Sequence, residues 1–205
     1  MMAGLAERTL DRAVKGLLQR DDNLAAAAIA DDEEIDQLEK QIDKEGVDVL
    51  LRFQPVASDL RRVVAAMKLS PNIERIADQA TNIARRARKL NKHEPLPELK
   101  IIAPIHANAV AMFKDSIDAF VREDVDLGRA VVARDKDLDY MNKMANRTLT
   151  DRMAQDPKQL RGYLNLIFIS RCLERVGDHA TNIAEDAVYA AAAEDIRHQT
   201  VAPSA

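Results

Sequence analysis

Apolar residues recur every three or four positions along most of the chain, which is the spacing that predicts amphipathic α-helices. Only 6 Gly and 7 Pro interrupt 205 residues, and helix formers such as Ala, Leu and Arg abound. Ser58 is the expected N-cap of the third helix, and Pro157 suits the first turn of the sixth. The six predicted helices span about residues 3–20, 23–46, 58–91, 99 or 103 to 122, 125–153 and 157–193.

The second half of this pattern repeats the first. Apolar positions of the first and fourth helices correspond at an offset of 103, and those of the third and sixth helices at an offset of 100. Each helix can bury one stripe against two neighbours, so the sequence predicts an all-α fold of two tandem, related three-helix bundles. The expected bundles are residues 1–91 and 98–193, with the proline-containing linker 92–97 between them and a flexible tail, 194–205.

Polar residues recur between the repeats along with the apolar ones. The third helix contains NIERIADQATNIARR and the sixth contains CLERVGDHATNIAED. Residues four apart share a helix face, so the acids of each stretch form a stripe roughly opposite its apolar stripe. Helices two and five add further acidic pairs and should lie beside helices three and six. The paired acids are Asp32 and Asp36 with Glu74 and Asp78, and Asp135 and Asp139 with Glu174 and Asp178.

Clustered carboxylates are typical ligands of hard cations such as Mg, Mn, Ca or ferric iron. Zinc is less favoured, because His179 lies about 100° from the acidic stripe and is expected at an edge. A solvated acidic face is the alternative, since the chain has 34 acidic residues. However, four like-charged pairs at equivalent places cost helix stability, and eight of eleven positions between 74 and 84 match 174 to 184. The repetition therefore favours metal sites.

Composition excludes several other functions. A net charge of -4 and 3% aromatic residues argue against nucleic-acid binding, and the basic run of residues 85–89 is expected to be a solvated helix end. No catalytic nucleophile motif is present. The single cysteine, Cys172, suits a reducing cytoplasm, and neither a membrane span nor a signal peptide is expected.

The chain resembles the PhoU family of phosphate-transport regulators over nearly its whole length. The resemblance is carried by QPVASDLR (54–61), IERIADQATNIAR (73–85), ARDKDLDYM (133–141) and LERVGDHATNIAE (173–185), with two ExxxD or DxxxD motifs in each half. It implies two three-helix bundles whose eight paired acids hold surface multinuclear metal sites. Ferric iron is the favoured metal, with Mn, Mg or Zn as alternatives.

The resemblance also implies a role. Family members are cytoplasmic, usually homodimeric and not enzymes. They act as negative regulators that couple the Pst phosphate ABC transporter, through its ATPase subunit, to a PhoR-type sensor kinase, and they reach the membrane only through these partners. Two alternatives remain open: a metal-dependent phosphohydrolase, and a helical adaptor without metal.

Three differences from the second repeat affect the first half. The first helix is expected to start near residue 3, whereas its counterpart near 99 corresponds to a position before Met1, and family members usually carry more sequence upstream. Pro71 lies inside the third helix and predicts a kink at 67–71, or a restart with Ser70 as cap. Arg85 also lies near the first acidic stripe, where the second repeat has Glu185. We therefore expect the second metal site to bind more tightly.

Overall fold

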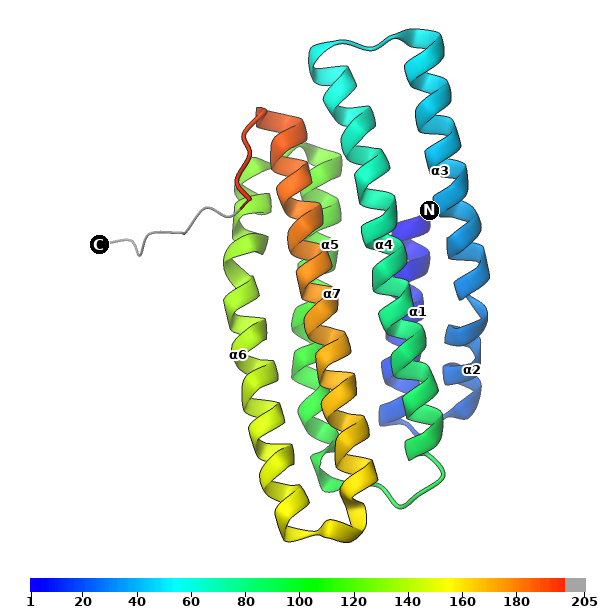
Figure 1. Ribbon diagram of the computed structural model, residues 1–205, viewed down its shortest axis with the longest axis vertical. Helices are drawn as coiled ribbons and strands as arrows, with labels where there is room; N and C mark the ends of the chain where they lie inside the picture. The colour runs from blue at the N-terminus through cyan, green and yellow to red at the C-terminus, as the bar shows by residue number, and fades with distance from the viewer. Residues whose placement is uncertain (198–205) are drawn as a thin grey trace, which may run out of the picture.

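Seven α-helices and two short 3₁₀ helices follow one another in the computed structural model, which describes residues 1–197 (Figure 1). The first repeat contains α1 (Met2–Leu18), α2 (Asp22–Ala30), α3 (Asp32–Phe53) and α4 (Ala57–Leu90). The second contains η1 (Pro97–Ile101), α5 (Ile102–Arg122), α6 (Val125–Gln155), η2 (Pro157–Gln159) and α7 (Leu160–Ala192). Helices α2 and α3 together occupy the place of one predicted helix, so the six-helix, two-repeat architecture is confirmed. The predicted tail 194–205 lies largely outside the described residues.

The predicted second helix, 23–46, is wrong in two respects. It is divided at Asp31, and it continues to Phe53. Asp31 turns its carboxylate towards α1, where it accepts hydrogen bonds from Thr9 Oγ1 at 3.0 Å and Arg12 Nη1 at 2.8 Å. Gly46 lies inside this helix, where a Cβ would come within 2.5 Å of Met67 Cγ on α4, so the packing of Met67 leaves no room for a side chain. These contacts come from other helices and are invisible in the local sequence pattern.

Helix α4 runs unbroken through Pro71. Proline lacks the N–H that would bond the carbonyl of Met67, four residues earlier. Ser70 supplies a substitute, since its Oγ donates to the Met67 oxygen at 3.2 Å. The expected restart with Ser70 as a helix cap is therefore wrong. The predicted cap at Ser58 is wrong as well, because α4 begins at Ala57 with Val56 in the cap position.

The two bundles lie side by side and share one core (Figure 1). Helices α4 and α7 pack against each other, and α1 packs against α5. The expected apolar stripe of α1 is fully buried, as Leu10, Val14 and Leu17 show no exposed surface. In the second repeat Phe113 is 1% exposed. Because the buried cluster is continuous across both repeats, the two acidic regions are mounted on one rigid support.

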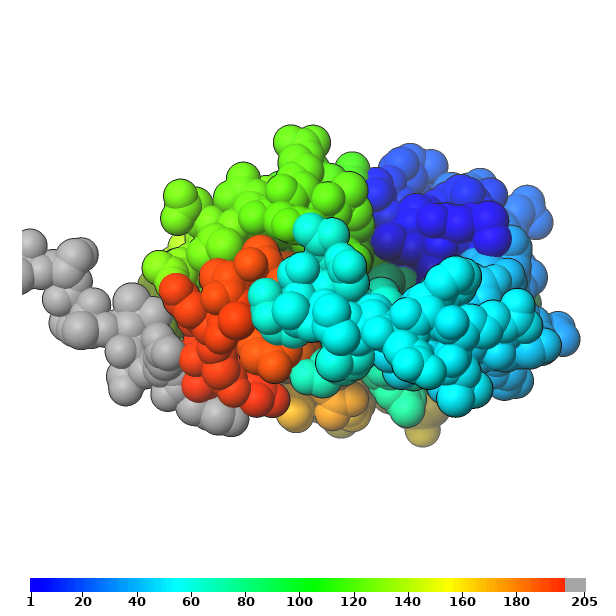
Figure 2. Space-filling view, turned by 90° about the horizontal axis from the view of Figure 1, so that it is seen from above, coloured from blue at the N-terminus to red at the C-terminus, as the bar shows by residue number. Residues whose placement is uncertain are grey.

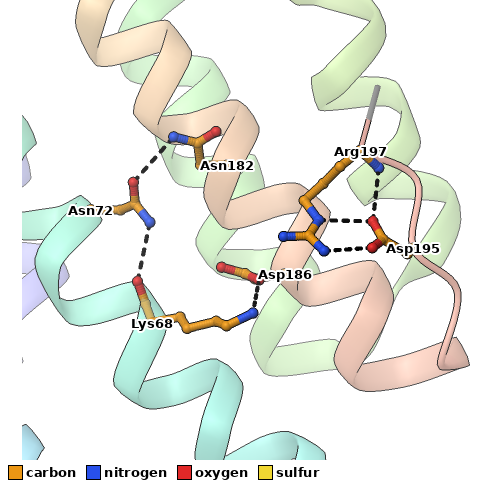
Figure 3. Close-up of polar contacts among 6 residues, drawn as sticks. All are labelled: Lys68, Asn72, Asn182, Asp186, Asp195 and Arg197. Carbon is orange, nitrogen blue, oxygen red and sulfur yellow. Dashed lines mark hydrogen bonds and ion pairs between the residues drawn. The ribbon is translucent and has the colours of Figure 1, made fainter. Parts of the chain in front are cut away.

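Polar contacts also join the repeats along the α4–α7 interface (Figure 3). Lys68 Nζ of α4 lies 3.4 Å from Asp186 Oδ1 of α7. The Asn72 side chain donates to the Lys68 carbonyl and accepts from Asn182 Nδ2 at 3.3 Å. The half-buried His179 places Nδ1 3.0 Å from Asn72 Oδ1. His179 is therefore an interface residue.

The α3–α4 hairpin extends beyond the rest of the molecule (Figure 1). Its tip exposes Leu51, Phe53 and Val56, the last two to 74%. Below the tip, Arg61 Nε of α4 donates to the Ala190 carbonyl near the end of α7. Seen from above, the hairpin overlies one side of the molecule (Figure 2). Within residues 1–197, no helix combines the length and the apolar character that a membrane span needs.

Candidate metal centre

Three carboxylates of the second repeat converge at the α6–α7 interface. Asp135 and Asp139 lie one turn apart on α6, and Asp178 lies on the neighbouring α7. Each offers one oxygen, and these oxygens lie within 4.8 Å of one another. Asp135 is partly buried, whereas Asp139 and Asp178 are exposed, so an ion could enter from solvent. An all-oxygen donor set of this kind suits a hard cation.

A threonine holds the first aspartate of each acidic group. Thr181 Oγ1 of α7 donates to Asp135 Oδ1 at 3.3 Å, and Thr81 Oγ1 of α4 donates to Asp32 Oδ1 at 3.2 Å. Thr81 follows Asp78 by three residues, and Thr181 follows Asp178 by three residues. Both threonines therefore lie at equivalent places in the two repeats and face the adjacent helix. The sequence shows that these threonines recur but assigns them no role. Each of these hydrogen bonds orients a carboxylate of the neighbouring helix.

The first repeat places its acids on the corresponding helices but arranges them differently. Arg75 lies beside both motif acids of α4, with Nε 3.3 Å from Glu74 Oε2 and Nη1 3.0 Å from Asp78 Oδ2. Arg175 occupies the equivalent position in α7, yet it forms no ion pair within the described part of the chain. Asp32, Asp36, Glu74 and Asp78 do not bring three oxygens together as the second repeat does. The first repeat therefore fits a metal less well.

Burial and mutual repulsion raise the pKa values of five of these acids. Asp178 stays open to solvent on one side, yet the partial burial of its carboxylate, followed by the charges of Glu174, Asp135 and Asp139, raises its pKa to about 6. Burial and the neighbouring Asp78 raise the pKa of Glu74 to about 7. The pKa values of Asp32, Asp135 and Glu174 are also raised, chiefly by burial. A bound cation would relieve this repulsion, so the metal-free arrangement favours cation binding.

The ligand atoms that the second repeat offers are chemically suited to a hard cation. Asp135, Asp139 and Asp178 would be the ligands, with Glu174 close enough to influence their charges. His179 is not part of this set, because it contacts Asn72 on the other repeat. Oxygen-only ligation favours ferric iron, Mn or Mg over Zn. A bound ion would supply positive charge that ties α6 to α7.

The fold and the acidic groups together define a class of proteins: two-repeat helical bundles with candidate metal sites at equivalent places. The PhoU domain model matches residues 1–87 and 102–187, one match in each repeat. The chain belongs to the PhoU family and is a homologue of phosphate-specific transport system accessory proteins. The resemblance expected from the sequence is thereby confirmed.

Individual relatives support this assignment. A phosphate-specific transport system accessory protein PhoU homologue of Pseudomonas putida is 40% identical over 198 residues, covering 96% of this chain and 77% of the relative. A Serratia marcescens accessory protein PhoU is 34% identical, covering 96% and 81%. The crystal structure of PhoU from Pseudomonas aeruginosa aligns with a TM-score of 0.89 at 39% identity, over 92% of this chain and 91% of that one. A Streptococcus pneumoniae PhoU structure, 22% identical with a TM-score of 0.87 over 95% and 92%, shares the fold.

Proposed function

We propose that this protein is a cytoplasmic negative regulator of phosphate uptake and of the phosphate-starvation response. It acts by binding rather than by catalysis. The observation that carries the proposal is the match of both repeats to the PhoU domain. Relatives that cover almost this entire chain are described as accessory proteins of phosphate-specific transport.

The expected partners follow from the same family. The protein forms a homodimer and links the ATPase subunit of a Pst-type phosphate transporter to a PhoR-type sensor kinase. The exposed apolar side chains of Leu51, Phe53 and Val56 support a role in protein binding, because such side chains at a protruding tip are commonly covered by a partner. It reaches the membrane only through these proteins.

Metal binding at the second repeat belongs to this proposal. Asp135, Asp139 and Asp178 hold a hard cation, with ferric iron favoured and Mn or Mg as alternatives. The ion fixes α6 against α7 and so stabilises one surface of the second bundle. The first repeat, where Arg75 pairs with Glu74 and Asp78, holds a cation less tightly.

Deletion and complementation in the source organism test the regulatory role. Deletion of the gene should raise expression of a phosphate-starvation reporter in phosphate-rich medium, and the wild-type gene should restore repression. Unchanged expression after deletion would contradict the proposal. Complementation with Asp135→Asn/Asp178→Asn should fail, whereas the matched Asp32→Asn/Asp78→Asn should repress. Equal repression by both variants would remove the metal from the mechanism and leave the regulatory role standing.

A further inference from the structure

A pocket outside the acidic clusters opens at the end of the molecule opposite the α3–α4 tip. There the linker that follows α4 lies near the α6–α7 turn (Figure 1). The pocket has a volume of about 330 Å³. Its walls come from the last turn of α4, the linker, η2 and the first turns of α7. No acid of either candidate metal site lines it.

The lining of this pocket is strongly cationic. Lys89 and Lys92 contribute from the end of α4 and the linker, and Lys158 and Arg161 contribute from η2 and α7. Glu94 is the acid among the lining residues. The chain as a whole carries a net charge of -4, so this concentration of positive charge is a local feature.

None of the four cations forms an ion pair with an acid inside residues 1–197. Other cations at this end of the molecule do form ion pairs. Arg152 Nε of α6, for example, lies 2.9 Å from Glu98 Oε1 of η1. Like charges around one pocket repel one another, and an anion between them would relieve that repulsion. Four unpaired cations around one pocket therefore indicate a site for an anion.

The linker wall is held in place without any ligand. Arg20 Nη2 donates to the Asn91 carbonyl at 2.8 Å and to the His93 carbonyl at 2.5 Å. Asn91 Nδ2 donates to the Gly16 carbonyl at 3.1 Å. Leu96 is 6% exposed and packs beside Gly162, where an added Cβ would lie 2.9 Å from its Cδ1. A pre-formed pocket binds an anion without the entropy cost of ordering its walls.

We propose that this pocket binds an oligophosphate: a small anion with two or more linked phosphoryl groups, free or carried by a nucleotide. Arginine pairs with phosphate oxygens through its guanidinium fork, and lysine binds phosphate as a point charge. Cations reach the pocket from two separate segments, so an anion with several charged groups can contact both. The volume lies near the lower end for small-molecule sites and exceeds what a single phosphate needs. This site extends the proposed function, which does not include a small-molecule ligand.

Isothermal titration calorimetry of the whole chain tests the proposal. Sodium tripolyphosphate, ATP, orthophosphate and sulfate are titrated separately in about 150 mM salt with EDTA, which prevents metal binding at the acids. Tripolyphosphate should bind saturably, and at least tenfold more tightly than orthophosphate or sulfate. Lys92→Gln/Arg161→Gln should weaken tripolyphosphate binding at least tenfold. The matched variant Lys143→Gln/Arg147→Gln, which removes two exposed cations of α6, should bind like the wild type.

The two phosphate sources give different results. Equal affinities for tripolyphosphate and ATP support free oligophosphate as the ligand, while tenfold tighter ATP binding supports a nucleotide. No saturable binding of either compound would overturn the proposal. So would equal weakening by both double variants, which would show a general charge effect. Displacement of tripolyphosphate by duplex DNA more effectively than by ATP would identify a nucleic-acid surface and would also overturn it.

Discussion

Thr81 and Thr181 show how a single hydroxyl group shapes each acidic region. Each threonine reaches across to the neighbouring helix and donates to an aspartate, Asp32 in one repeat and Asp135 in the other. The hydrogen bond stabilises the ionised carboxylate and lowers its pKa, partly offsetting burial. It also fixes the direction of the carboxylate towards its neighbours. Only the Thr181 bond serves a group of three converging acids.

Thr181→Val should weaken metal binding at the second repeat. Valine keeps the shape of threonine but removes the donor, so Asp135 loses both its orientation and part of its ionisation. We expect the affinity for Mn²⁺ to fall by about tenfold, the lower end of the loss when a group that orients a metal ligand is removed. Calorimetric titration of the metal-free protein measures this. Thr81→Val is the matched control and should leave the Mn²⁺ affinity of the second repeat unchanged. Equal losses of affinity in both variants would contradict the role of Thr181.

Glu74 makes the stability of the metal-free protein depend on pH. Its pKa rises from an ordinary value of 4.5 to about 7, through burial and the charge of Asp78. Between these values the folded state keeps a proton that the unfolded state has released. Stability therefore falls as the pH rises through this range. The pairing with Arg75 reduces the effect but does not cancel it.

Glu74→Gln should remove this loss of stability. Relative to wild type, the variant should gain roughly 1 kcal/mol in free energy of unfolding between pH 5 and pH 8, after allowance for solvent screening. Urea unfolding of both proteins in EDTA at several pH values measures the difference. A difference that stays constant across the range would show that Glu74 titrates normally in the folded state.

The spacing predicts which helices carry the eight acids, but it does not predict their unequal arrangement. Arg75 and Arg175 are the same residue type at equivalent positions, yet only Arg75 pairs with the acids beside it. That difference depends on how the neighbouring helix positions its carboxylates, which the sequence does not show. The expected asymmetry was based on Arg85 and Pro71. Pro71 is accommodated within α4 by Ser70, so Arg75 gives the stronger physical reason.

At the level of helices, each repeat uses a different pair of residues to bring its acidic helices together. In the second repeat Gly177 of α7 faces Leu138 of α6, and an added Cβ would lie 2.2 Å from Leu138 Cδ2. The corresponding residues of the first repeat are Ala77 and Ile35, both buried. Gly177 is next to Asp178, and Leu138 is next to Asp139. The close approach of the backbone at Gly177 therefore helps to set the distance between acids on α6 and α7.

Gly177→Ala should disturb this contact. We expect the free energy of unfolding to fall by about 1–2 kcal/mol, because overpacking outweighs the better helix propensity of alanine. Leu138→Ile in the same protein recreates the pair of the first repeat and should restore part of the loss. Urea unfolding of the single and double variants measures the coupling. Purely additive effects would contradict a direct contact between these two side chains.

The helical fold and its internal repeat could be predicted from the sequence. The ends of the helices could not, because they depend on contacts with other helices of the chain. Gln54 has a left-handed backbone, with φ of 46°, and terminates α3 before Pro55. Beyond Gly46, apolar residues such as Leu51 and Phe53 stay exposed, so no buried apolar face marks this part of the helix in the sequence.

The cationic pocket could not be predicted from the sequence either. Its lysines and arginine are distant in sequence, and only the folded chain brings them together.

At the scale of the whole molecule, two related bundles share a core but carry unequal acidic regions. The repeat places equivalent acids on equivalent helices, while Arg75 neutralises part of the first group. The second group keeps three converging oxygens and the unfavourable repulsion that a cation would relieve. The proposed metal sites would therefore be unequal, and we expect the second repeat to retain metal more tightly than the first.

The measurement that tests this account most directly is a metal titration of two matched variants. Asp32→Asn/Asp78→Asn alters the first repeat, and Asp135→Asn/Asp178→Asn makes the equivalent change in the second. Mn²⁺ is titrated into each metal-free protein, with bound ion followed by electron paramagnetic resonance. The account predicts that the first variant keeps the tightest site within about threefold, while the second loses at least tenfold in affinity. Equal affinities in the two variants, or a greater loss in the first, would contradict it.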